Sequence, residues 1–104
     1  MNNRIPIIMI GACAASSHFV SEQLKEEFRK RKIRAQFMEV RASDVPQLTK
    51  TVKPDLIIFT ASIYPKEGIP PDIPVLNGIP LLSGIGAQEL INKIAETITK
   101  KKQE

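Results

Sequence analysis

Cys13 and His18 are the only cysteine and the only histidine of the chain, and both lie in one short segment. The apolar run from Ile7 to Ile10 precedes them, and an amphipathic stretch follows. A loop of small side chains between a strand and a helix lets backbone N–H groups converge, and the positive end of the helix dipole points the same way. We therefore expect an anion site suited to phosphoryl chemistry, with Cys13 as the catalytic residue and the phosphate bound by Gly11, Ala12, Ala14, Ala15, Ser16, Ser17 and His18.

Each polar residue of this segment also has a simpler interpretation. A free cysteine is often just a small buried apolar residue. Near a helix N-terminus, however, the pKa of a thiol falls below its usual value of about 8.5, which favours the reactive thiolate. We expect Ser16 and Ser17 to be helix caps, a role compatible with phosphate contact. His18 is either a phosphate ligand, an alternative acceptor or a solvated residue of the first helical turn.

Size and charge restrict the function further. At 104 residues the chain makes one domain, residues 1–104, that is too small for separate substrate and cofactor domains and should act with partners. The surplus of 15 Lys and Arg over 11 Asp and Glu is concentrated at residues 29–34 and 100–102. We interpret these cations as solvated helix ends, with residues 100–104 forming a frayed basic tail. No tryptophan, zinc-finger spacing or RNA-binding aromatic signature is present, so we expect no nucleic-acid partner.

The cysteine count and the apolar runs bear on location. A single cysteine excludes an internal disulfide framework, no signal peptide is visible, and no apolar run approaches the roughly 18 to 20 residues that span a bilayer. We expect a cytoplasmic protein with a reduced thiol and no direct membrane insertion. One Cys and one His cannot complete a metal-ligand set without scattered carboxylates, so neither a metal nor a cofactor is expected.

Apolar periodicity predicts alternating strands and helices. Continuous or alternating apolar runs predict strands at residues 5–10, 33–40, 56–60 and 73–76. Apolar residues at helical spacing predict a first helix over residues 17–31, a short helix capped by Ser43 and Asp44, and a last helix whose apolar face is Leu90, Ile91, Ile94 and Ile98. Residues 62–72 contain four prolines or glycines and predict an irregular connection.

This alternation indicates an α/β fold. We predict a single-domain, three-layer sandwich with a four-stranded parallel sheet, Rossmann-like or flavodoxin-like, and right-handed crossovers. Ligands of such sheets bind beyond the carboxyl ends of the strands, where the loop after the first strand must lie. That loop is placed like the one of low-molecular-weight tyrosine phosphatases, but residues 11–20 contain no arginine, so phosphatase chemistry ranks last.

Three stretches resemble one family. Residues 7–28 give a strand, a small-residue loop and a helix; residues 55–61 read DLIIFTA; and residues 72–86 carry Ile-Pro, Gly-Ile-Pro and Ser-Gly-Ile-Gly. Together they resemble the cytosolic IIB component of the bacterial phosphoenolpyruvate-dependent sugar phosphotransferase system (PTS), galactitol-type branch. The resemblance implies a phosphotransferase whose cysteine accepts phosphate from a phosphohistidine of a IIA partner and passes it to sugar on a membrane IIC partner. The family run also makes pocket lining or partner contact an alternative to turn and cap roles for Asn77, Gly78, Ser83, Gly84 and Gly86.

The position of the cysteine departs from the family pattern. Family members of this branch close the first strand with the nucleophilic cysteine, and glycine follows it. Aligning residues 15–18 with the family's Ala-Thr-Ser-Thr without gaps puts Ile10 on that cysteine and Gly11 on the glycine, with Cys13 three residues late. Either the loop is shortened and Cys13 is the nucleophile, or the chain is a catalytically silent IIB-like domain for anion binding or protein interaction.

Overall fold

The computed structural model describes residues 5–60 and 67–103, without the side chains of Ala14 and 101–103. Its centre is a four-stranded sheet in the order β2-β1-β3-β4, with every neighbouring pair parallel. The strands are β1 Ile7–Gly11, β2 Gln36–Val40, β3 Leu56–Phe59 and β4 Val75–Asn77. This order is the flavodoxin-like one, and the predicted α/β fold with a four-stranded parallel sheet is confirmed.

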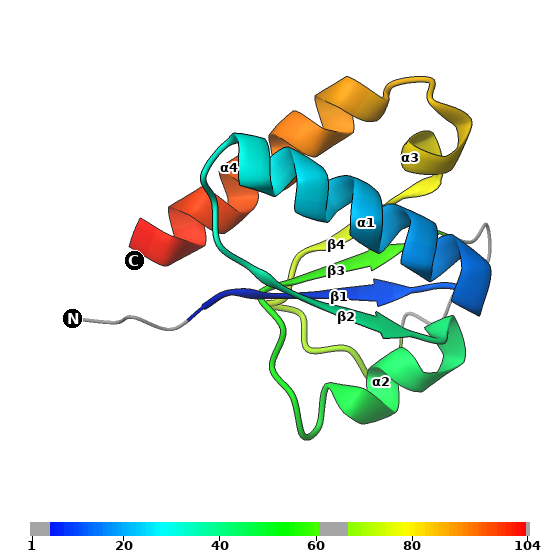
Figure 1. Ribbon diagram of the computed structural model, residues 1–104. Coiled ribbons are helices and arrows are strands. Elements are labelled where there is room, and N and C mark those ends of the chain that lie inside the picture. The colour runs from blue at the N-terminus through cyan, green and yellow to red at the C-terminus, as the bar shows by residue number, and fades with distance from the viewer. Residues whose placement is uncertain (1–4, 61–66, 104) are drawn as a thin grey trace.

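Helices cover both faces of the sheet, which gives three layers (Figure 1). One face carries the two long helices, α1 Ala14–Lys30 and α4 Ala87–Gln103, together with the short α3 Ile79–Ser83. The other face carries the 3₁₀ turn η1 Ala42–Asp44 and the single-turn helix α2 Val45–Leu48. Among the described helices, none is both long and apolar enough to cross a bilayer.

The alternation of side chains along the strands divides the core in two. Ile8 and Ile10 of β1 are fully buried on the face of α1 and α4, where they pack with Leu24 and Phe28 of α1 and Ile94 of α4. The intervening Met9 packs on the opposite face, with Val45, Ile57, Phe59 and Ile73. The predicted apolar face of the last helix is confirmed, since Ile91, Ile94 and Ile98 are buried and Leu90 packs against them. Burial on both faces explains why β1 and β3 are continuous apolar runs.

The first helix starts earlier than the sequence indicated. It begins at Ala14 instead of about Ser17, and Cys13, in an extended conformation, is its N-cap residue. The prediction that Ser16 and Ser17 cap the helix is therefore wrong, because both lie inside its first turn. Alanine is the best helix former, so Ala14 and Ala15 extend the helix back to the loop.

Other elements differ in length from the prediction. The helix after Asp44 is a single turn, Val45–Leu48, and the Asp44 side chain makes no capping hydrogen bond. The structure adds α3, which the sequence analysis missed because five residues are too few to show a helical period. The last helix runs to Gln103, into the stretch that was predicted to fray. Part of the predicted connection over residues 62–72, namely 61–66 with Tyr64, lies outside the described residues.

Candidate functional site

The carboxyl end of β1 leads into α1 through two residues, Ala12 and Cys13. Gly11, which ends the strand, is required by packing, since a Cβ there would lie 2.9 Å from the Phe59 ring and 2.9 Å from Val45 Cγ2. Ala12 is buried, and Cys13 is exposed. The short connection therefore turns the chain within two residues and leaves the thiol at the surface, at the edge where ligands of parallel α/β sheets bind.

The Cys13 thiol lies against the first turn of α1. Its Sγ atom is 3.2 Å from the Ser16 Oγ atom, in a hydrogen bond that the Ser16 hydroxyl can donate once the thiol is ionised. The Ser16 hydroxyl is the largest cause of a lowered pKa of the Cys13 thiol, and the backbone N–H of Ser16 comes next. Desolvation raises this pKa, and the backbone N–H groups of Ala15 and Cys13 lower it further. The thiolate form is thus favoured by the groups that N-terminal helix turns offer to anions.

The backbone amides of the expected phosphate site divide into two groups. The Ala12 N–H donates to the Val40 carbonyl at 3.0 Å, and the Ser17 N–H donates to the Cys13 carbonyl at 2.9 Å. These two amides continue the sheet and begin the helical ladder, so they are not directed at the thiol. The N–H groups that act on the Cys13 sulfur belong to the first turn of α1 and to Cys13 itself.

His18 lies on α1 two residues after Ser16 and faces the end of β2. Its Nδ1 atom is 3.3 Å from Glu39 Oε1, and 66% of the His18 side chain is exposed. Within the described residues no hydrogen bond joins His18 to Cys13, and no group of three His, Cys, Asp or Glu side chains is placed to hold a metal ion. His18 is therefore an exposed side chain of α1 that contacts the Glu39 carboxylate and not the thiol.

The five residues predicted for the rim all serve the turns around α3. Asn77 Oδ1 accepts a hydrogen bond from the Ile79 N–H at 2.8 Å, and Ser83 Oγ accepts one from the Ile85 N–H at 3.2 Å. Gly84 and Gly86 have φ of 86° and 78°, and a Cβ on the buried Gly78 would lie 2.6 Å from Ile58 Cγ2. These roles are structural. Because β1, β3 and β4 are parallel, Asn77 at the end of β4 lies at the same end of the sheet as Cys13, and β3 lies between them.

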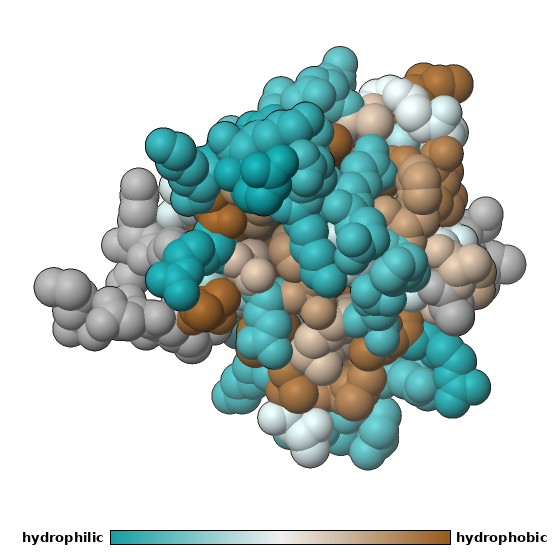
Figure 2. Space-filling model, in the orientation of Figure 1, coloured by the Kyte–Doolittle hydropathy of each residue, from teal (hydrophilic) through white to brown (hydrophobic). Residues whose placement is uncertain are grey.

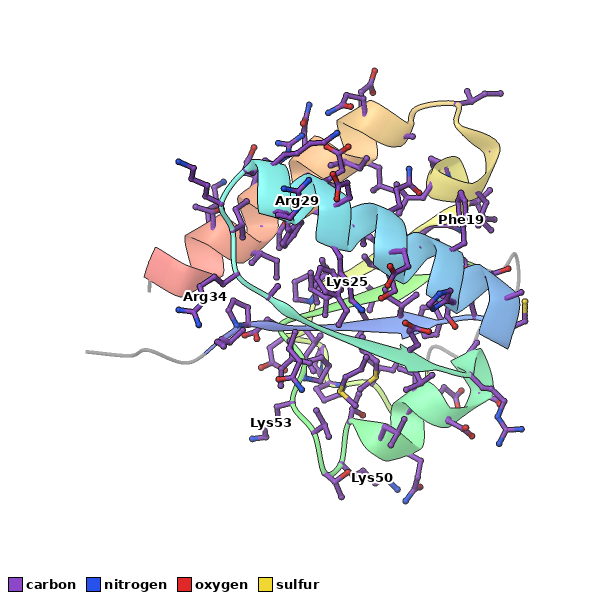
Figure 3. All side chains as sticks on the ribbon, in the orientation of Figure 1. Phe19, Lys25, Arg29, Arg34, Lys50 and Lys53 are labelled. Atoms are coloured by element: carbon purple, nitrogen blue, oxygen red, sulfur yellow. The ribbon has the colours of Figure 1, made fainter. Side chains whose placement is uncertain are left out.

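Exposed apolar side chains near this edge were not anticipated. Phe19 of α1 is 54% exposed, Ile85 after α3 is 83% exposed, and Ile79 and Leu82 of α3 are also exposed. The two helices are in contact, and Figure 3 places Phe19 on the part of α1 close to α3. One signal was available in the sequence: Phe19 lies beside, not on, the apolar stripe that starts at Val20. Exposed apolar groups that gather at one edge are typical of a protein-docking surface.

Comparison with known proteins identifies the family of the chain. The chain is 32% identical over 88 residues to the PTS system galactitol-specific EIIB component of Escherichia coli K12, a match that covers 85% of this chain and 88% of that protein. The chain belongs to this EIIB family. Proteins of the same name from Escherichia coli O157:H7 and Shigella flexneri are 31% identical over the same shares. No family model matches, and no solved structure matches.

The resemblance carried by residues 7–28, 55–61 and 72–86 is thus confirmed as family membership. Ile10, which aligns without gaps with the family's cysteine, is fully buried in the core. Cys13 is the exposed free cysteine.

Proposed function

We propose that this EIIB-type chain is a phosphocarrier, in which Cys13 accepts a phosphoryl group from a phosphohistidine of a IIA protein and passes it to a sugar bound by a membrane IIC protein. The observation that carries the proposal is the exposed Cys13 thiol, hydrogen-bonded to Ser16 at the N-terminus of a 17-residue helix. The relatives are named galactitol-specific, so galactitol is the first sugar to test.

The proposed relay consists of two balanced displacements. In the first, the Cys13 thiolate attacks phosphorus, an S–P bond forms, and the P–N bond of the donor breaks with its electron pair left on the imidazole. The proton that the thiol released is taken up by that imidazole. In the second, a sugar hydroxyl attacks phosphorus, the P–O bond forms as the S–P bond breaks, and the hydroxyl proton restores the thiol. Phosphoryl transfer of this kind depends chiefly on positioning and on stabilisation of charge.

The first turn of α1 supplies that stabilisation in the proposal. The groups that lower the pKa of the Cys13 thiol, the Ser16 hydroxyl and the N–H groups of Ala15 and Ser16, are also the donors within reach of phosphate oxygens on the sulfur. The helix dipole favours negative charge at this end. Gly11, Ala12, Ser17 and His18 then act indirectly, through the short connection, the helical ladder and the surface beside it.

The exposed apolar residues around Phe19 and Ile85 support contact with protein partners at this edge. A carrier must present the same sulfur to a donor and then to an acceptor, so the surface beside the sulfur has to accommodate two proteins in turn. The rim residues 77–86 shape that surface by fixing α3 against α1.

A phosphorylation experiment tests the proposal directly. The purified chain is incubated with a IIA protein phosphorylated on its histidine, and intact-mass spectrometry counts the phosphoryl groups on the chain. We expect one group, absent from the Cys13→Ser variant and retained in His18→Gln, which keeps the fold and the thiol. Absence of phosphate on the unchanged chain would instead support the catalytically silent IIB-like domain, the function that the buried Ile10 favours. Phosphate that survives in Cys13→Ser and disappears in His18→Gln would assign the acceptor role to His18.

A further inference from the structure

A hollow lies at the end of the sheet opposite to Cys13, where the strands begin. It has a volume of about 550 Å³ and is formed by the C-terminal half of α1, the turn that follows it, the start of β2 and Ile5. The hollow is open to solvent and has room for a small molecule. Four cationic side chains line the hollow, and no Asp or Glu does: Lys25, Arg29, Lys32 and Arg34.

The floor of the hollow is apolar and ordered by packing. Phe28 of α1 and Phe37 of β2 meet edge to face, with ring centroids 5.5 Å apart and an interplanar angle of 70°. Phe28 is 1% exposed, and Ile33 packs against the same core. In Figure 2 apolar side chains show between hydrophilic ones on the face below α1. Phe28 therefore supports the floor from beneath, and the half-buried Ile33, Ala35 and Phe37 provide its accessible apolar surface. A ring placed on that surface gains free energy from burial.

The cations around the floor come from both sides of the turn. In Figure 3, Lys25 and Arg29 project from α1, and Arg34 lies on the segment that enters β2. Lys25 pairs with Glu22, and Arg29 with Glu26, both on the helix surface. Among the described residues, Lys32 and Arg34 have no carboxylate partner. The side chains that line the hollow are cationic where they are charged, and an anion is the group that complements Lys32 and Arg34.

The backbone at Lys32 supports the importance of this charge. Lys32 has φ of 59°, the left-handed conformation, and is the only non-glycine residue of the described chain with a positive φ. Its position closes α1 in a Schellman turn, in which the Ile33 N–H donates to the Phe28 carbonyl at 2.9 Å and the Lys32 N–H to that of Arg29 at 3.2 Å. Glycine is the usual residue at this position. A lysine there costs backbone strain but places an ammonium group at the edge of the hollow.

We infer that this hollow binds a small organic anion that combines a ring-sized apolar body with a phosphate or carboxylate group. The ring lies on the half-buried side chains of Ile33 and Phe37, which Phe28 supports from beneath, and the anionic group contacts Lys32 and Arg34. The site is separate from the thiol, because residues 32–37 lead into the start of β2 whereas Cys13 follows the end of β1 and these strands are parallel. Its occupant therefore leaves the phosphoacceptor edge open.

Titration of the full chain with 1-naphthyl phosphate, followed by amide NMR, tests the inference. We expect saturable shifts at Ile33, Arg34 and Phe37, weaker binding of 1-naphthol and of inorganic phosphate at these residues, and unchanged binding in Cys13→Ser. Shifts confined to Cys13, Ala15 and Ser16, or equal affinities for naphthyl phosphate and inorganic phosphate at the hollow, would overturn it. The outcome is independent of the phosphorylation experiment, which measures the other edge.

Two variants separate a binding role from a structural one. Arg34→Glu should weaken naphthyl phosphate binding about fivefold or more, the factor for one screened ionic contact, while Lys50→Glu, an equal charge change at an exposed residue outside the hollow, should leave it unchanged. Lys32→Gly should also weaken binding although it relieves the left-handed backbone. Equal effects of Arg34→Glu and Lys50→Glu, or full affinity in Lys32→Gly, would show that the hollow is not the site.

Discussion

Replacement of Lys32 by glycine should stabilise the fold. Lys32 holds φ of 59° at the C-terminal turn of α1, where its backbone N–H and that of Ile33 satisfy the carbonyls of Arg29 and Phe28. The left-handed conformation costs an L-residue roughly 1–2 kcal/mol. Glycine avoids this cost but loses more backbone entropy on folding, which offsets the gain by roughly 0.5–1 kcal/mol. We expect a net gain of about 1 kcal/mol in the free energy of unfolding, or roughly 4 °C in Tm for a domain of this size.

Thermal and urea denaturation, followed by circular dichroism, measure this gain, and two controls isolate its cause. Lys32→Ala removes the charge but keeps Cβ, so it should leave stability nearly unchanged. Lys30→Gly places glycine at a helical residue of the same helix and should cost about 0.5–1 kcal/mol. A Lys32→Ala variant as stable as Lys32→Gly would refute the backbone argument and assign the gain to relief of repulsion among neighbouring cations.

Two further predictions concern the thiol and the core. Ser16→Ala should raise the pKa of the Cys13 thiol, since the Ser16 hydroxyl is the largest cause of its lowering. The pH profile of iodoacetamide alkylation should therefore move to higher pH, and an unchanged profile would contradict this assignment. Gly78→Ala should destabilise the fold by about 1–3 kcal/mol in urea denaturation, because the new Cβ would lie 2.6 Å from Ile58 Cγ2. Ser43 is exposed, so Ser43→Ala should serve both experiments as the neutral control. A Gly78→Ala variant as stable as Ser43→Ala would refute the packing argument.

The sheet was predictable from the sequence because its signal is strong and local. Ile8, Ile10, Leu56 and Ile58 stand in continuous apolar runs, and a strand buried on both faces needs such runs. The ends of elements were less predictable. β2 starts at Gln36, three residues later than expected, because the Schellman turn at Lys32 precedes it. This position is usually a glycine, and the lysine here gave no sequence signal for the turn.

The candidate site was only partly predictable for a related reason. The residue types at 11–18 indicated an anion site, but not which amides are free to form it. Whether an amide joins a ladder depends on where β1 ends and α1 begins, and both boundaries lie within the run of small residues 11–17, in which nothing marks the start of the helix. The hydrogen bond between His18 and Glu39 could not be predicted either, because it joins residues of α1 and β2 that are 21 positions apart in the sequence.

The position of Cys13 can now be understood in terms of these boundaries. β1 cannot slide to bring Cys13 to its end, because a shift by three residues, an odd number, would turn Ile8 and Ile10 away from the face of α1 and α4. Gly11 also has to remain where its missing side chain admits Phe59 and Val45. The connection is instead reduced to two residues, and the donors near the sulfur come from the first turn of α1. A cysteine at the N-cap of a helix can therefore keep the electrostatic setting of a phosphoacceptor although the strand ends in an isoleucine and a glycine.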